Sequence, residues 1–184
     1  MSAVLTPRRH KLSVDDYHKL SDAGVFAPDA RVELIDGELI DMAPVGGPHI
    51  RIVNRLNRLL VTAVGTDAEV SVQNPITLPP GSEPQPDLSL VRFGTGVPTA
   101  SEVLLVIEVA DSTLTFDRAI KLPLYARAAI PEVWIVDVNA QAIEIYRDPM
   151  GDGFQLHWKV GLRDSVLLLA LPRVTIAVAS VFAP

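Results

Sequence analysis

Two acidic residues stand where a carboxylate is costly to bury. Asp87 opens a short apolar segment, and Glu108 closes the nearly unbroken aliphatic run 103–109. A carboxylate at the end of a buried strand must be paired, hydrogen-bonded or bound to a cation. Two of them on neighbouring strands repel each other unless a cation lies between them, and oxygen ligands suit Mg²⁺ or Mn²⁺. Both are therefore candidate metal ligands; capping of loops or pairing with arginines is the alternative.

A lysine follows these acids on a segment with a helical pattern. The chain has four lysines and twelve arginines, so lysine is the less common choice where only positive charge is needed. Lysine can deprotonate when it is desolvated, or polarise a water molecule as a point charge. Asp117, Lys121 and Tyr125 are spaced at i, i+4 and i+8, on roughly one helix face. Lys121 is therefore a candidate base or charge beside the acids; an Asp117–Lys121 surface pair is the alternative.

The elements that position these residues begin with a helix and a hairpin over residues 13–42. Ser13 is typical of a helix N-cap, and Asp36-Gly37 is a strong turn signal between two apolar runs. The best helical pattern covers about 49–64, and its apolar stripe consists of Ile50, Val53, Leu56, Leu60 and Val64. His49 at its start is a candidate proton shuttle or phosphate contact; a polar helix start is the simpler interpretation.

Further patterns predict a mixed sheet. Strands are expected from residue 70 and over residues 87–92, 103–109 and 133–138, with a helix over 117–129. The order α-β-β-β-α-β over about 49–138 indicates a central mixed β-sheet flanked by helices. Residues 142–146 and 154–160 suit a hairpin, and residues 165–182 suit further strands and turns. The aliphatic residues 166–171 fit either a dimer interface or a core strand.

Bulk properties favour one ordinary globular domain over residues 1–184, because 48% hydrophobic and 21% charged residues are usual for such proteins. The absence of cysteine excludes disulfides and thiolate chemistry and favours a cytoplasmic location. The N-terminus has no secretory h-region, and no run reaches the ~18 apolar residues of a membrane span. A net charge of −6 argues against a protein that coats nucleic acid electrostatically.

Five motifs in this order and spacing resemble the Uma2 family, over residues 13–182. They are Arg31-Val-Glu-Leu-Ile-Asp-Gly-Glu38, Gln85-Pro86-Asp87, Ile107-Glu108-Val109, Asp117-(x3)-Lys121-(x3)-Tyr125 and Ile130-Pro-Glu-Val-Trp-Ile-Val-Asp137. Uma2 proteins are similar to the PD-(D/E)xK restriction-endonuclease-like nucleases. The resemblance implies that fold, with an added N-terminal hairpin and a β-rich C-terminal tail.

The same resemblance implies roles for individual residues. Asp87 and Glu108 correspond to the two metal-binding acids, and Glu33 is a third carboxylate for the metal. Lys121 takes the place of the catalytic lysine, and Gln85 lies at the edge of the site. The implied cofactor is Mg²⁺ or Mn²⁺, the implied substrate is DNA, and a homodimer is plausible.

The chain departs from the family pattern at three positions. The general nuclease motif has a lysine two residues after the second acid, where this chain has Ala110. Ala129 stands where a glycine usually ends the helix in the left-handed conformation. Pro123 removes a helical hydrogen bond two residues past Lys121, and the resulting kink could redirect that lysine.

Three hypotheses follow from the sequence. The first is a metal-dependent endonuclease that hydrolyses phosphodiester bonds of DNA. The second is a catalytically inactive descendant that keeps the fold as a binding or oligomerisation module, which the net charge and Ala110 favour. The third is an RNA or nucleotide hydrolase that uses the same site.

Overall fold

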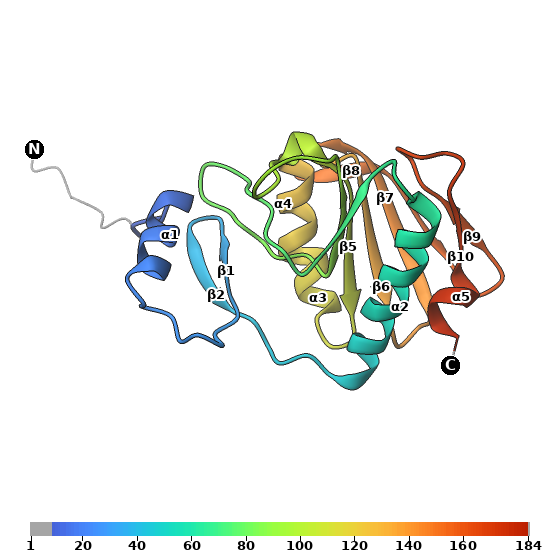
Figure 1. Cartoon of the computed structure of the whole chain (residues 1–184), viewed down its shortest axis with the longest axis horizontal. Coiled ribbons are helices and arrows are strands. Elements are labelled where there is room, and N and C mark those ends of the chain that lie inside the picture. Colours follow the sequence, from blue (N-terminus) through green and yellow to red (C-terminus); the bar gives the residue numbers. More distant parts are fainter. Residues whose placement is uncertain (1–8, 184) are drawn as a thin grey trace, which may run out of the picture.

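A six-stranded mixed sheet forms the centre of the computed structural model, which describes residues 9–183 and leaves residues 1–8 and 184 of the expected domain outside (Figure 1). The strand order is β3-β4-β5-β6-β7-β8. Their bounds are β3 Glu69–Val72, β4 Leu88–Val91, β5 Val103–Ala110, β6 Glu132–Asp137, β7 Ala142–Met150 and β8 Gly153–Val160. Neighbouring strands are antiparallel except β5 and β6, which are parallel and therefore need a crossover connection.

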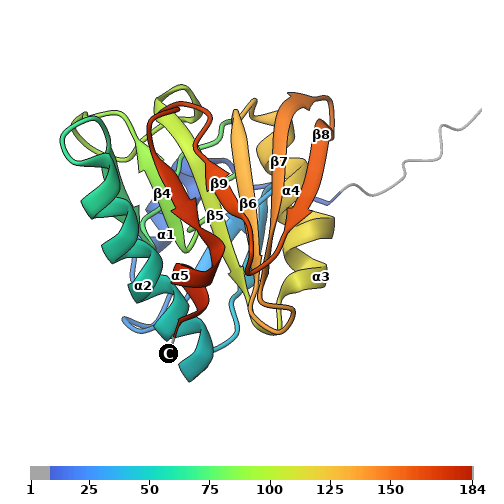
Figure 2. The ribbon, with the colours of Figure 1, turned by 90° about the vertical axis from the view of Figure 1, so that its right-hand side faces the viewer.

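Helices cover both faces of this sheet (Figures 1 and 2). One face packs against α2 (Gly47–Val64) and the C-terminal elements β9 (Ser165–Leu167), β10 (Thr175–Ala177) and α5 (Val178–Phe182). The other face packs against the β5–β6 crossover, whose three helical parts are α3 (Leu114–Phe116), a π-helical turn η2 (Asp117–Lys121) and α4 (Leu122–Arg127). A short 3₁₀ turn, η1 (Ala100–Glu102), precedes β5. Two apolar cores therefore enclose the sheet.

The N-terminal part consists of α1 (Val14–Asp22) and the hairpin of β1 (Val32–Ile35) and β2 (Glu38–Asp41). Ser13 caps α1 in a capping box with Asp16, as the sequence predicts. The loop 78–83 holds the hairpin on the molecule, because the Glu83 N–H donates to the Leu34 carbonyl at 2.7 Å and the Gly37 N–H donates to the Gly81 carbonyl at 2.6 Å. This attachment places Ile35 of β1 in the apolar core that also contains Leu124 and Tyr125 of α4.

The predicted order α-β-β-β-α-β is present as α2, β3, β4, β5, the crossover helix and β6. After this core of about 49–138, β7 and β8 pair onto β6 and extend the same sheet, with Ile143 and Ile145 in its apolar core. One expectation about the C-terminal part is wrong, because the tail ends in the helix α5 and not in strands and turns. Val166 and Leu168 are buried in the core, which favours the core-strand interpretation; the homodimer stays a prediction.

The prediction of one regular helix over 117–129 is corrected in the same way. The helical part begins at Leu114 and widens into the π-helical turn just before Pro123, where the Leu122 N–H donates to the Asp117 carbonyl. Proline has no N–H to continue an α-helical ladder, so the wider turn accommodates it without a break. Ala129 ends the segment with φ +57°, the left-handed conformation that usually falls to glycine and that costs an alanine about 1 kcal/mol.

One position of the expected α2 stripe is also wrong. Ile50 is 44% exposed, while Ile52 is buried with Val53, Leu56 and Leu60. At ~100° per residue, Ile50 lies roughly 120° around the axis from Leu56, whereas Ile52 lies within about 40° of it. His49 shares the buried face, which turns it towards the sheet. No helix among residues 9–183 is long and apolar enough to cross a membrane.

Candidate active site

Glu108 is a carboxylate inside the most buried strand of the sheet. All eight residues of β5 are buried, and alternation places Glu108 with Val106 and Ala110 on the face that α4 covers. Two side chains from that crossover reach it. The hydroxyl of Tyr125 donates to Glu108 Oε1 at 2.5 Å, and Lys121 Nζ lies 3.2 Å from the same oxygen. Lys121 therefore reaches the second acid from the helix, and the small Ala110 stands where the general motif has its lysine.

Glu33 joins this group from the N-terminal hairpin. It is 2% exposed, and its Oε1 lies 3.2 Å from Lys121 Nζ. The backbone N–H of Gln85 also donates to the Glu33 carboxylate. The other carboxylate oxygen, Oε2, is buried without a hydrogen-bond partner, which is rare and costly for a buried acceptor. Glu33 therefore lies near Glu108, on the other side of Lys121, and its Oε2 can still accept a hydrogen bond or bind a cation.

Asp87 lies at the entrance to β4 and receives three hydrogen bonds. Its Oδ1 accepts from His49 Nε2 at 2.9 Å and from the Gln73 amide at 3.3 Å. Its Oδ2 accepts from the backbone N–H of Val109 at 2.8 Å, directly beside Glu108 in the chain. Burial opposes ionisation of Asp87, but these hydrogen bonds outweigh burial and hold its pKa below the ordinary value.

Lys121 is the cation at the centre of the site. It is 2% exposed and bridges Glu33 and Glu108. Burial alone would lower its pKa, but the carboxylates of Glu108, Glu33, Asp117 and Asp87 outweigh burial and raise it. An ammonium stabilised in this way keeps its proton at neutral pH. Of the two roles expected for Lys121, base or point charge, this arrangement favours the point charge, and the role itself stays a prediction.

The remaining acids have raised pKa values because they are buried and lie close to other carboxylates. Burial raises the pKa of Glu108 well above its ordinary value, and the nearby carboxylates add to this while Lys121 opposes it. Burial likewise raises the pKa of Glu33. Asp117, whose Oδ2 accepts from the Thr113 hydroxyl at 2.7 Å, has its pKa raised by burial to about 6. A cluster of acids with raised pKa values is typical of functional sites.

Asp117 gives a pH dependence whose sign can be tested. An acid whose pKa is higher in the folded protein contributes stability that is complete below its ordinary value, 3.8, and is lost as the pH rises through about 6. The difference corresponds to on the order of 3 kcal/mol. Asp117→Asn keeps the acceptor for Thr113, so we expect the variant to be more stable than the wild type at pH 7.5 and to lose this advantage at pH 4.5. Urea unfolding in EDTA at both pH values measures this; parallel profiles for the two proteins would contradict it.

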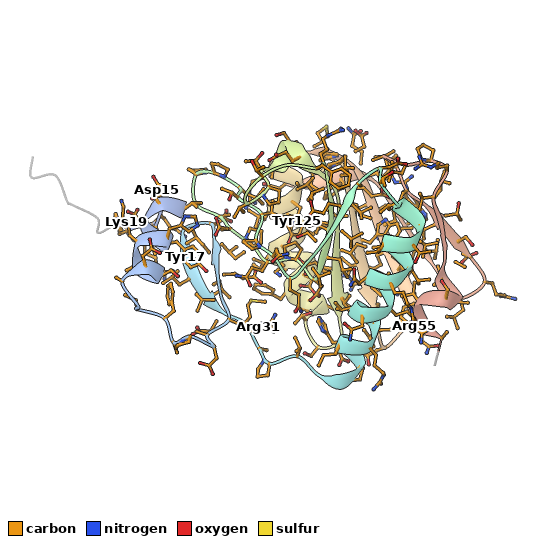
Figure 3. All side chains as sticks on the ribbon, in the orientation of Figure 1. Asp15, Tyr17, Lys19, Arg31, Arg55 and Tyr125 are labelled. Atoms are coloured by element: carbon orange, nitrogen blue, oxygen red, sulfur yellow. The ribbon has the colours of Figure 1, made fainter. Side chains whose placement is uncertain are left out.

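These side chains line a cavity of about 60 Å³. Its wall consists of Arg31, Glu33, residues 42–46, His49, Gln85, Asp87, Glu108, Val109, residues 111–113, Asp117 and Lys121. In Figure 3, Tyr125 lies in the interior of the molecule, whereas Arg31 lies near the hairpin of β1 and β2. Four acids of the cavity wall are buried, whereas residues 43–46 of the same wall are exposed.

The donor set suits a divalent cation in kind and in charge. Four carboxylates face one ammonium, all donors are hard oxygens, and Glu33 Oε2 has no partner. Among residues 9–183, however, no three acids or histidines are already grouped closely enough to hold one ion. Lys121, Tyr125 and His49 engage the oxygens that a cation would share. The fit is therefore one of chemistry and charge, and side-chain movement is needed to complete a coordination sphere.

The structure brings together all eight residues that the sequence predicts for the site: Asp87, Glu108, Lys121, Glu33, Gln85, His49, Asp117 and Tyr125. His49 lines the cavity, where it is buried and bonded to Asp87, and its expected role as a proton shuttle or phosphate contact stays a prediction. Sequence reasoning missed Gln73 and Arg31. Only the left-handed backbone of Gln73, which has φ +52°, marks it as unusual, and no sequence pattern signals that.

Two comparisons with known proteins found matches. The model of the Uma2 family, described as "Putative restriction endonuclease", matches residues 14–179. The chain is also similar to the crystal structure of "a putative nuclease belonging to DUF820" from Anabaena variabilis, with a TM-score of 0.75 and 15% sequence identity. That similarity covers 94% of this chain and 98% of the other, and at this identity it shows the fold alone. No curated protein matches. The predicted fold class is confirmed.

Proposed function

Because the chain belongs to the Uma2 family, we propose that it is a divalent-metal-dependent nuclease that hydrolyses phosphodiester bonds of DNA. The observation that carries the proposal is the buried cluster in which Glu33, Asp87, Glu108 and Asp117 surround the single ammonium of Lys121. A fold gains no stability from burying more carboxylates than cations. A catalytic site for phosphate chemistry does need them, because they attract and hold a metal ion.

Asp87, Glu108 and Glu33 would hold Mg²⁺ or Mn²⁺. Such an ion, when bound, activates an attacking water molecule and neutralises charge on the scissile phosphate. Lys121 stays protonated and offers a positive charge to the phosphate oxygens as negative charge develops on them. The Tyr125 hydroxyl fixes the orientation of Glu108, and the Val109 N–H does the same for Asp87. Asp117, whose pKa is raised to about 6, is the group that can carry a proton near neutral pH.

The size of the cavity favours a polymer over a free nucleotide. Pockets that enclose small ligands usually measure ~300–1,000 Å³, whereas this one measures about 60 Å³. There is room for an ion, water and a phosphate edge, while the sugar and base stay outside. Arg31 and Gln85, at the cavity wall, are the residues placed to meet a backbone phosphate. The choice of DNA over RNA rests on the description of the family.

Incubation of the purified protein with supercoiled plasmid tests the proposal directly. We expect nicked and linear products with Mg²⁺ or Mn²⁺ and no products with EDTA. Single-stranded DNA, RNA and a free nucleoside triphosphate are tested in parallel. Cleavage of RNA alone would replace DNA as the substrate, and hydrolysis of the free nucleotide alone would contradict the argument from cavity size.

The inactive binding module remains the second candidate, because the acids already have partners within the chain. Titration calorimetry with Mn²⁺ separates the two. Binding at or below millimolar concentration supports the nuclease, and no binding at that concentration supports the module.

A further inference from the structure

Asp87 is held by side chains from two elements that lie on either side of it. His49 reaches it from the first turn of α2, and Gln73 reaches it from the connection that follows β3. Both donate to the same oxygen, Oδ1, while Val109 in β5 holds Oδ2. Among the described residues, the donors to Glu33 are Lys121 and the Gln85 N–H, and the donors to Glu108 are Lys121 and Tyr125. Asp87 is therefore the acid whose orientation the surrounding fold specifies most completely.

His49 acts on Asp87 as a hydrogen-bond donor. Its side chain is buried, and its Nε2 lies 2.9 Å from Asp87 Oδ1. Because a carboxylate oxygen accepts, this contact requires a proton on Nε2, directed at Asp87. The other ring nitrogen, Nδ1, has no hydrogen-bond partner among the described residues, so the contact with Asp87 is the hydrogen bond that the ring makes.

Gln73 acts on the same residue through its backbone and its side chain. Its N–H donates to the Asp87 carbonyl at 3.1 Å, and its amide donates to Asp87 Oδ1 at 3.3 Å. Its φ of +52° lies in the left-handed region, where residues other than glycine are uncommon. An unfavourable conformation of this kind persists where surrounding structure or function maintains it. Here it directs the glutamine side chain back at Asp87.

We propose that His49 and Gln73 are positioning residues, which orient the Asp87 carboxylate for a divalent cation through hydrogen bonds to its Oδ1. The inference rests on the proposed function and goes beyond it. Residues that hold a metal ligand in place often change metal affinity about 10- to 100-fold when they are replaced. The proposed role requires only that each residue donates a hydrogen bond to Asp87, and it involves no proton transfer.

Mn²⁺ affinity, measured by calorimetry on the full chain, tests the role of His49 with two variants. In His49→Gln the amide nitrogen replaces Nε2, so we expect affinity within about threefold of the wild type. In His49→Asn the amide nitrogen corresponds to Nδ1 and cannot reach Asp87, so affinity should fall by about 10-fold or more. Equal affinities for both variants would overturn the inference for His49.

Gln73 has a matched control in Gln141, which is exposed, lies in the turn between β6 and β7 and has φ +49°. Glycine at either position relieves the left-handed backbone, so both variants should melt at or above the wild-type temperature. Only Gln73→Gly should bind Mn²⁺ about 10-fold more weakly. A purely structural role for Gln73 predicts a change in melting temperature alone, and that result would overturn the inference.

Failure of the proposed function is distinct from failure of this inference. Wild-type protein that binds no Mn²⁺ at millimolar concentration removes the metal site and the positioning roles together. Wild-type binding that all three variants at positions 49 and 73 retain unchanged removes only the positioning roles.

Discussion

Replacement of Lys121 by methionine is expected to abolish DNA cleavage and to destabilise the fold. Methionine fills similar space but removes the only cation that bridges Glu33 and Glu108 among the described residues. Removal of one partner from a buried ion pair costs about 3–5 kcal/mol, because the remaining charges stay buried without compensation. Loss of a charge that stabilises the transition state reduces the rate by about 10²- to 10³-fold. Urea unfolding and plasmid nicking with Mn²⁺ measure the two effects.

The expected destabilisation depends on pH. Glu33 and Glu108 already have raised pKa values, so without Lys121 they take up protons more readily and relieve their own repulsion. The loss of stability should therefore be larger at pH 8 than at pH 5. Activity is compared at a temperature where circular dichroism shows the variant folded. Undiminished cleavage by a folded Lys121→Met protein would exclude Lys121 from the mechanism.

Lys159 provides the matched control. It pairs with Asp137 at 3.4 Å and with Glu144 at 3.6 Å, but its side chain is 44% exposed. Exposed ion pairs contribute at most about 1 kcal/mol. We therefore expect Lys159→Met to retain cleavage and nearly all stability, which shows that loss of a lysine as such has little effect.

Glu108→Gln is expected to change metal binding and stability in opposite directions. A raised pKa means that the Glu108 carboxyl contributes stability below its ordinary value and that this is lost as the pH rises. Ionisation of this buried carboxyl is therefore unfavourable for the fold, and a neutral amide of the same shape avoids it. Lys121 keeps Glu33 as a partner, and the amide oxygen still accepts from Tyr125. We expect the variant to melt at or above the wild-type temperature.

The same change should nearly eliminate metal binding and cleavage. Loss of a charged ligand should exceed the effect of losing its supporting residues, so Mn²⁺ affinity is expected to fall by more than about 100-fold. Calorimetry with Mn²⁺ and plasmid nicking measure this. A protein that becomes more stable as it loses its activity is the pattern expected of a functional site.

Glu144 is the control for this variant. It is also buried on a strand, and it lies on the same face of the sheet, paired through Ile135 of β6 with Glu108 in β5. Burial opposes its ionisation, but Arg118 and Tyr146 outweigh burial and lower its pKa. The sign is therefore reversed, and Glu144→Gln should lose stability above pH 5 while it binds Mn²⁺ normally. A loss of stability in both variants would contradict the inference that the Glu108 carboxyl destabilises the fold when it is ionised.

Much of the fold follows from local patterns. The aliphatic run of β5, the Asp36-Gly37 turn, the Ser13 cap and the end of α2 at Gly65 are each specified by residues near in sequence, so periodicity and turn preferences predict them. The two strand-end acids follow for the same reason, because an acid in an unbroken apolar run needs a partner wherever the strand is placed.

Other features depend on which side of an element faces the core. Periodicity alone placed Ile50 on the buried face of α2, where Ile52 lies instead, and it could not show the π-helical turn before Pro123. It predicted the hairpin of β7 and β8 but not that β7 pairs with β6, because pairing to a strand outside the hairpin depends on tertiary contacts. In each case, the packing partner decides among arrangements that are locally similar.

The chemistry of the site also depends partly on the sequence and partly on the tertiary structure. The sequence by itself determined which side chains could act, namely the acids and a lysine, and the order in which they follow one another. Only the tertiary structure placed Glu33 beside Lys121, which is 88 positions away, and brought His49 and Gln73 to Asp87. The tertiary structure also favours a point charge over a base as the role of Lys121, which stays a prediction. The pKa of a lysine depends on the balance between burial and neighbouring carboxylates, and that balance exists only when distant segments pack together.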